Sequence, residues 1–177
     1  MNWRTLKSSY PFLCPWLRVR KDHVILPSGF EMDDFYVIES NDWVNVIAIT
    51  EDGRYIIEEQ YRHGIGRICF ELPAGNVSKG ENPLDAAKRE LMEETGFAGG
   101  KWELFCDSAP NASGMDNLCH TFLAKGVKKN TEPHLESSEE IHVHLKTKDE
   151  VVELLKNNSI VEAVMQAPLW RYIKERT

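Results

Sequence analysis

The sequence predicts an α+β fold in which helices cover a mixed β-sheet, and three observations support this prediction. Short β-branched and aromatic segments precede one strongly marked helix, further strands follow that helix, and two helical segments close the chain. Strands on both sides of a central helix favour an α+β sandwich over a doubly wound sheet. The length of 177 residues predicts a single domain with one core, spanning residues 1–177.

A strand meander and a hairpin are predicted before the helix. The expected meander strands are residues 12–20, 23–27 and 34–39, with breaks at Pro15, Pro27-Ser28-Gly29 and Ser40-Asn41-Asp42. Residues 43–50 and 55–62 form two further expected strands, joined across Asp52-Gly53, a dipeptide typical of hairpin turns. Residues 67–72 then give another strand, which Pro73-Ala74-Gly75 ends.

The clearest helix is predicted from Pro83 to Thr95. Asn82 can cap its start, Pro83 takes the first position, where a missing N–H costs nothing, and Gly96 supplies a left-handed stop. The elements expected after it are strands at 102–106, 118–124 and 141–145 and helices at 148–157 and 160–174.

Composition excludes several classes of function. The net charge of −7 argues against broad attraction to nucleic acid or to an anionic membrane. The first ten residues do not resemble a secretory signal, and no apolar run approaches the roughly 20 residues that span a bilayer, so we expect a cytoplasmic location. Four scattered cysteines without a C-x-x-C pair predict buried free thiols: Cys14, Cys69, Cys106 and Cys119.

The predicted central helix carries several acids close together. Glu90 and Glu94, at i and i+4, share one face, Glu93 lies within reach of Glu90, and Arg89 can pair with Glu93. Like charges repel on one helical turn, and near the C-terminal end they also oppose the helix dipole. A hard divalent cation such as Mg²⁺ would compensate them, because it takes oxygen ligands. A solvated acidic face is the alternative that the helix alone leaves open.

This helix and the loop before it resemble the Nudix hydrolase signature, G-x5-E-x7-R-E-U-x-E-E-x-G-U, where U is a bulky apolar residue. The positions that match in register are Gly75, Glu81, Arg89, Glu90, Leu91, Glu93, Glu94, Gly96 and Phe97. Flanking segments resemble the branch of ADP-ribose pyrophosphatases and related nucleoside-diphosphate-sugar hydrolases: Glu59-Gln60-Tyr61-Arg62, Phe70 to Gly75, Ser108 to Asn111, and Glu139-Glu140-Ile141.

The resemblance implies a Nudix-type α/β/α sandwich with a mixed central sheet and an N-terminal antiparallel strand extension of about residues 1–42. It also implies a homodimer in which the N-terminal strands contribute to the partner's site. The implied reaction is hydrolysis of the diphosphate bridge of ADP-ribose or a similar nucleoside-diphosphate sugar, with Mg²⁺, or alternatively Mn²⁺, as cofactor. A hydrolase of nucleoside triphosphates or dinucleoside polyphosphates and a non-catalytic nucleotide-sugar-binding domain are the alternatives.

Roles for the motif residues follow from the same resemblance. Glu90 and Glu94 are the implied principal metal ligands, with the Ala74 carbonyl as a further ligand. Glu93 is implied as a ligand of a second metal or of a bound water, and Arg89 would orient it. The structural positions of the motif are Glu81 at the loop–helix junction, Gly75 where backbone approaches the metal, and Gly96 at the helix end.

Residues outside the motif complete the expected site. Arg62 is a candidate for the substrate phosphates because of its planar fork, with an exposed surface arginine as the alternative. Tyr36 and Trp43 are candidates for stacking on a nucleobase, although aromatic strand residues are more often core residues. Glu71 is a candidate for contact with substrate or metal, with an ordinary strand residue as the alternative.

The acidic loop at 135–141 departs from the family pattern. Related sequences carry a motif such as L-D-E-x-E-D-I, and Glu139 matches its later glutamate, which reaches the metals. Ser137 stands at the earlier glutamate, and serine is a poor base. Glu136 or Glu139 would then take the proton with help from Glu93, unless the rate is low or the substrate is not ADP-ribose.

Overall fold

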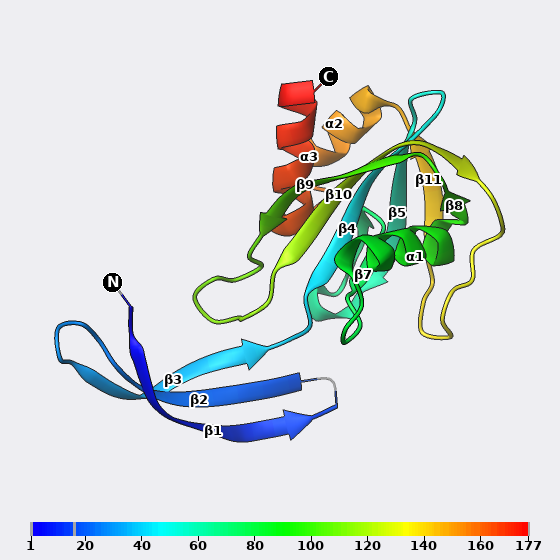
Figure 1. Cartoon of the computed structure of the whole chain (residues 1–177). Coiled ribbons are helices and arrows are strands. Elements are labelled where there is room, and N and C mark those ends of the chain that lie inside the picture. The colour runs from blue at the N-terminus through cyan, green and yellow to red at the C-terminus, as the bar shows by residue number, and fades with distance from the viewer. Residues whose placement is uncertain (1, 16, 177) are drawn as a thin grey trace. The chain divides into compact units, whose positions relative to one another are not determined.

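The computed structural model describes residues 2–15 and 17–176, which fall into two compact units (Figure 1). One unit holds the residues up to Asn41 together with Ala109–Leu118. The other unit holds Asp42–Ser108 and the residues from Cys119 onward. The predicted extension of about residues 1–42 ends close to this boundary, whereas its place in a single domain and at a dimer interface stays a prediction.

The first unit is a three-stranded antiparallel sheet in the order β1-β2-β3. Its strands are β1 (Arg4–Cys14), β2 (Leu17–Ile25) and β3 (Glu31–Glu39). The break predicted at Pro15 is confirmed, because β1 ends at Cys14 and β2 begins at Leu17. The gap left between residues 20 and 23 was wrong, because β2 continues through Lys21 and Asp22, and β1 begins at Arg4 rather than at residue 12. The polar pair Lys21-Asp22 lies inside a continuous strand. Its acid fits there because Asp22 is buried and accepts hydrogen bonds from Arg20 and Ser8.

The second unit is built on a mixed sheet in the order β11-β5-β4-β10-β8. Strand β6 also pairs with β5, β7 with β4, and β9 with β10, while β4 and β10 run parallel. The strands are β4 (Trp43–Thr50), β5 (Tyr55–Arg62), β6 (Arg67–Glu71), β7 (Ala74–Asn76), β8 (Phe97–Ala98), β9 (Lys101–Ser108), β10 (Cys119–Lys129) and β11 (His142–Lys146). A 3₁₀ turn, η1 (His63–Ile65), joins β5 to β6. The predicted hairpin at Asp52-Gly53 is confirmed, with Gly53 at φ 81°.

Helices cover both faces of this mixed sheet, so the predicted sandwich is confirmed. Along β4, Val44 and Val46 join the core cluster that includes Leu91 of α1 (Pro83–Thr95). Ile47 points to the other face and joins the cluster that includes residues of α2 (Lys148–Lys156) and α3 (Ala163–Arg176). The alternation of side chains along one strand therefore fills two separate cores.

The three helix predictions are confirmed, with shifts of one to three residues at the end of α2 and at both ends of α3. α1 has the predicted bounds: Asn82 Oδ1 accepts the Leu84 N–H at 2.9 Å, and Gly96 adopts φ 72°. A Cβ on Gly96 would lie 2.1 Å from the Thr131 carbonyl oxygen, so the stop requires glycine for space as well as conformation. α3 begins at Ala163 rather than at residue 160, because the Glu162 carbonyl accepts the first helical N–H groups.

The cysteines are free, as predicted, but only two of them are buried. Cys69 and Cys119 are buried, whereas Cys14 and Cys106 are partly exposed. The prediction of four buried thiols was therefore wrong for Cys14 and Cys106. Among the described residues, no helix combines the length and apolar composition needed to cross a membrane.

Candidate active site

The loop between β6 and α1 brings backbone against the carboxylates of the helix. β7 pairs with β4, with Ala74 opposite Asn45, and this pairing fixes the loop beneath α1. The Ala74 N–H donates to Glu94 Oε2 at 2.9 Å. A Cβ on Gly75 would lie 2.1 Å from the carboxyl carbon of Glu90. The two acids that share a helix face therefore both meet residues 74–75.

Gly75→Ala is expected to lower kcat at least tenfold with little change in melting temperature. The added methyl group would push the Glu90 carboxylate aside, and misplacement of a reacting group by about 1 Å can cost a hundredfold in rate. Gly75 does not adopt a positive φ, so alanine fits its backbone. Steady-state kinetics and thermal melting check this, with Gly64→Ala, whose Cβ meets open space, as the control. Normal activity of Gly75→Ala would show that the Glu90 position does not matter.

Arg89 connects the loop to the helix at their junction by several hydrogen bonds. Nε and Nη2 donate to the two carboxylate oxygens of Glu81 at 2.9 and 3.0 Å. Nη1 donates to Glu90 at 2.8 Å and to Glu93 at 3.1 Å, and Nη2 also reaches the Asn76 carbonyl at 3.1 Å. These hydrogen bonds, above all those to Glu81, raise the pKa of Arg89. One guanidinium thus fixes three acids of the motif in a single arrangement.

Glu81 closes the other side of this junction. Its Oε2 accepts the Ser78 N–H at 2.9 Å in addition to the Arg89 fork. The hydrogen bonds from Arg89, followed by the one from Ser78, lower the pKa of Glu81 from 4.5 to about 2. Glu81 is therefore a structural residue of the junction in this geometry, as the resemblance implies.

Acid unfolding provides a test of the Glu81 assignment. A depressed folded-state pKa contributes stability that is present above the unfolded pKa of 4.5 and is lost as the pH falls toward about 2. We expect the melting temperature of Glu81→Gln to fall less steeply than that of the wild type in this window. Asp52 and Glu150, whose pKa values are also lowered, contribute equally to both proteins. Parallel curves of melting temperature against pH would contradict the assignment.

Three glutamates are buried beside this junction. Glu94 is 5% exposed, Glu71 2% and Glu58 1%. Burial raises the pKa of Glu94 and that of Glu58, and repulsion between these two acids adds to the effect. Removing a charge from water costs several kcal/mol for each ion in a real protein. Burial therefore favours the protonated forms of these carboxyl groups, and a bound cation would stabilise the ionised forms.

Glu58 was missed by the sequence predictions. Neither of its carboxylate oxygens receives a hydrogen bond from a described residue. The available signal was its position: Glu58 directly follows the apolar run Tyr55-Ile56-Ile57 and stands two positions after Ile56, so its side chain lies on the same face as that of Ile56.

The residues present suit a hard divalent cation. Within residues 2–15 and 17–176, no three His, Cys, Asp or Glu side chains converge as a preformed metal cage. Mg²⁺ does not need such a cage, because it keeps several waters and uses one or two carboxylates together with substrate phosphates. The unpaired oxygens of Glu58 and the buried Glu94 provide oxygen donors of this kind. The Ala74 carbonyl stays a predicted ligand.

Arg62 and Glu71 pair with each other. Arg62 Nε donates to both Glu71 oxygens, at 2.8 and 3.0 Å. This pairing raises the pKa of Arg62, and Glu162 lies close enough to add to the effect. The Arg62 side chain is still 44% exposed, so part of the guanidinium faces solvent. The substrate roles of both residues stay predictions.

The acidic loop contributes Glu139 to the field of the cluster. The Glu136 N–H donates to Glu139 Oε2 at 2.8 Å, and the Glu139 N–H donates to the Glu136 carbonyl at 3.0 Å. The charge of Glu139 contributes to the raised pKa values of Glu58, Glu90 and Glu94. Glu139 is partly buried, whereas Glu136 and Ser137 are exposed.

The two predicted aromatic contacts lie in different units. Trp43 begins β4 and packs against the core cluster that includes α2 and α3. Tyr36 lies on β3 in the N-terminal sheet, is half exposed, and has Lys21 Nζ 5.9 Å from its ring centroid. Stacking on a nucleobase stays a prediction for both.

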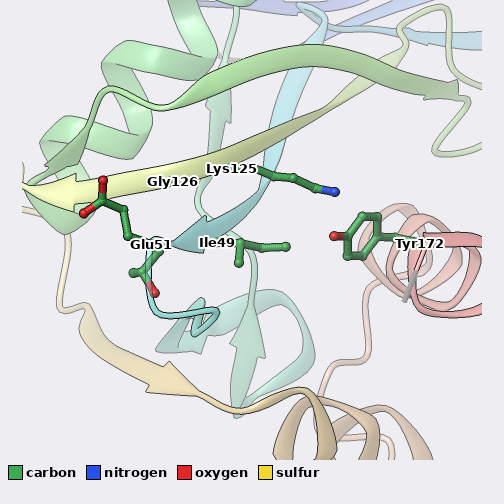
Figure 2. Close-up of a pocket in the computed structure, with 6 residues that line it drawn as sticks. Ile49, Glu51, Lys125, Gly126 and Tyr172 are labelled. Atoms are coloured by element: carbon green, nitrogen blue, oxygen red, sulfur yellow. The ribbon is translucent and has the colours of Figure 1, made fainter.

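A separate cavity of about 550 Å³ lies at the far end of β4 from Ala74 (Figure 2). Figure 2 shows Lys125 extending toward the ring of Tyr172, with 5.2 Å between Nζ and the ring centroid. The residues that line this cavity are Ile49, Thr50, Glu51, Lys125, Gly126 and Tyr172. None of them belongs to the carboxylate cluster.

Comparison with known proteins decides the family. The model of the NUDIX domain matches residues 41–166. The chain belongs to the Nudix family. Residues 3–38 match a second model, the nucleoside diphosphate sugar hydrolase N-terminal domain. The recognition made from the motif is therefore confirmed, and this Nudix protein is an enzyme of the hydrolase class.

Relatives of this Nudix hydrolase include two curated Bacillus proteins. It is 31% identical to a methanol dehydrogenase activator of Bacillus methanolicus, covering 90% of this chain and 86% of the relative. It is 29% identical to an ADP-ribose pyrophosphatase of Bacillus subtilis, covering 80% and 77%. A crystal structure of an ADP compounds hydrolase matches its fold with a TM-score of 0.85 at 17% identity, over 100% of this chain and 98% of that chain.

Proposed function

We propose that this Nudix hydrolase is a magnesium-dependent pyrophosphohydrolase of ADP-ribose or a similar nucleoside-diphosphate sugar. Its products are a nucleoside monophosphate and a sugar phosphate. The observation that carries the proposal is the cluster of buried acids at the Nudix helix, where no described residue other than an acid reaches the Glu58 carboxyl group. The similarity to ADP-ribose pyrophosphatases supports the substrate class.

Each residue of the site has a proposed task. Glu90 and Glu94 would hold Mg²⁺, or Mn²⁺ in its place, with the Ala74 carbonyl, Glu93 and Glu139 as further ligands. The bound ion would supply charge neutralisation of the diphosphate and acidification of water. Arg89 holds one oxygen of Glu93 and one of Glu90, so neither carboxylate is free to turn away. Gly75 leaves the space that Glu90 occupies.

In the reaction, a water oxygen attacks one phosphorus of the diphosphate and the bridging P–O bond breaks. The leaving phosphate takes the electron pair of that bond, and a carboxylate takes the proton of the attacking water. Glu93 and Glu139 are the proposed proton acceptors, with Glu136 as the further candidate in the same loop. Arg62 would contact the substrate phosphates beside Glu71, and Tyr36 and Trp43 the nucleobase.

We further propose that the protein acts as a homodimer of single Nudix domains, each with an N-terminal extension. The N-terminal unit supports this, because many large apolar side chains in and beside its three strands are exposed. These side chains are Trp3, Leu6, Tyr10, Phe12, Leu13, Leu17, Phe30, Tyr36 and Ile38. Light scattering after size-exclusion chromatography measures the mass directly.

A substrate panel tests the proposed activity. The purified protein is incubated with Mg²⁺ and ADP-ribose, ADP-glucose, GDP-mannose, NADH, diadenosine polyphosphates or nucleoside triphosphates, and the products are identified by mass. Nucleoside monophosphate from the diphosphate sugars is the expected result. Release of pyrophosphate from triphosphates alone would favour the alternative hydrolase, and tight binding without products would favour a binding domain.

A further inference from the structure

The central strand β5 carries a buried acid, Glu58, that the proposed chemistry leaves without a task. Glu58 is 1% exposed. Ile56, two positions earlier, belongs to the core cluster under α1, whereas Ile57 belongs to the cluster under α2 and α3. Because side chains alternate along a strand, Glu58 points to the same side as Ile56, toward α1. An apolar residue would complete this face, so the carboxylate needs an explanation.

The acids around Glu58 already accept hydrogen bonds from other residues. Its neighbour across the strand pair is Glu71, which Arg62 holds with a bidentate contact. The carboxyl group of Glu94 lies within hydrogen-bonding reach of Glu58, and it also accepts the Ala74 N–H. Neither oxygen of Glu58 has a hydrogen-bond partner among the described residues. Two ionised carboxylates cannot donate to each other, so either a shared proton or a cation must satisfy Glu58 and Glu94 together.

We propose that Glu58 is a further ligand of the catalytic divalent cation, opposite Glu94. The inference rests on the proposed function, because the cation is the one that the hydrolysis requires. The two carboxylates come from rigid elements in neighbouring layers, one from a central strand and one from the helix above it. A cation between the two carboxylates would remove the repulsion that burial makes severe.

Metal binding without substrate tests the proposal. Mn²⁺ titration followed by electron paramagnetic resonance, and Mg²⁺ titration calorimetry, give the dissociation constants. We expect Glu58→Gln, which keeps the shape of the side chain, to bind Mn²⁺ at least about tenfold more weakly than the wild type. The control is Glu59→Gln, the next residue, which points to the opposite face and pairs with His144 at 2.7 Å. It should bind Mn²⁺ like the wild type.

Thermal melting gives a second readout that does not depend on activity. In EDTA, Glu58→Gln and Glu58→Val should melt higher than the wild type by roughly 3 °C or more, because both remove an ionisable group whose burial is costly in either protonation state. Added Mg²⁺ should raise the melting temperature of the wild type more than that of either variant.

Two outcomes would overturn the proposal. Glu58→Gln that binds Mn²⁺ as tightly as the wild type would show that Glu58 acts as a neutral hydrogen-bond donor to Glu94. An unchanged or lower melting temperature of both variants in EDTA would show that Glu58 carries no unbalanced charge. A wild-type protein that binds neither cation would instead contradict the proposed function itself, so the two failures are distinguishable.

Discussion

Glu94→Gln is expected to lower kcat for ADP-ribose by roughly a hundredfold or more while the protein stays folded. Loss of a residue that only orients a metal ligand already costs 10- to 100-fold, so loss of a ligand itself should cost at least as much. The glutamine carbonyl can still accept the Ala74 N–H, which keeps the loop under the helix. The variant also loses a charge that burial makes unfavourable, so its stability in EDTA should match or exceed that of the wild type.

Kinetics, circular dichroism and thermal melting of the same preparation separate the chemical effect from the structural one. Asp85→Asn is the matched control, because it removes a carboxylate from the exposed first turn of the same helix. The control should keep full activity. A Glu94→Gln enzyme that turns over ADP-ribose at the wild-type rate would refute the ligand assignment.

Arg89→Lys is expected to lose both stability and activity. Lysine cannot reproduce the planar fork that reaches Glu81, Glu90 and Glu93 together, so at least one of these acids loses its partner. Hydrogen bonds between charged groups are worth about 1.5–3 kcal/mol, and a site one-third exposed is screened by solvent, so a loss of about 1–3 kcal/mol is expected. For a chain of this length the melting temperature should fall by roughly 3–10 °C.

The loss of activity in Arg89→Lys should exceed what its lower stability explains. Assays well below the melting temperature should show kcat reduced at least tenfold, because Glu90 and Glu93 are no longer held in place. Arg18→Lys is the control, since Arg18 makes one long, exposed ion pair with Glu39 at 3.7 Å. A stable and fully active Arg89→Lys enzyme would show that Arg89 has no positioning role.

Local signals explain why the catalytic helix could be predicted to the residue. A capping asparagine, a proline at the first position and a terminal glycine act within a few residues of each other, so their meaning does not depend on distant contacts. The hairpin at Asp52-Gly53 was predictable for the same reason. The positions of the motif acids then followed from the helix geometry.

The N-terminal strands and the buried glutamates depend on distant partners instead. β2 passes through Lys21 and Asp22 because Arg20 and Ser8 satisfy the buried carboxylate, and Ser8 belongs to another strand. The pairing of Arg62 with Glu71 likewise requires two strands in register. Glu58 shares its strand face with the apolar Ile56 and the polar Gln60, so the pattern alone does not show that it is buried among other acids.

The position of the metal tests the central claim most directly. A crystal grown with Mn²⁺ and a non-cleavable analogue of ADP-ribose allows the ion to be located by anomalous scattering. The proposed function predicts Mn²⁺ bound by the carboxylates of Glu90 and Glu94, with the diphosphate of the analogue on its open side. An ion and a diphosphate bound far from α1, with these carboxylates in contact with protein groups alone, would contradict it.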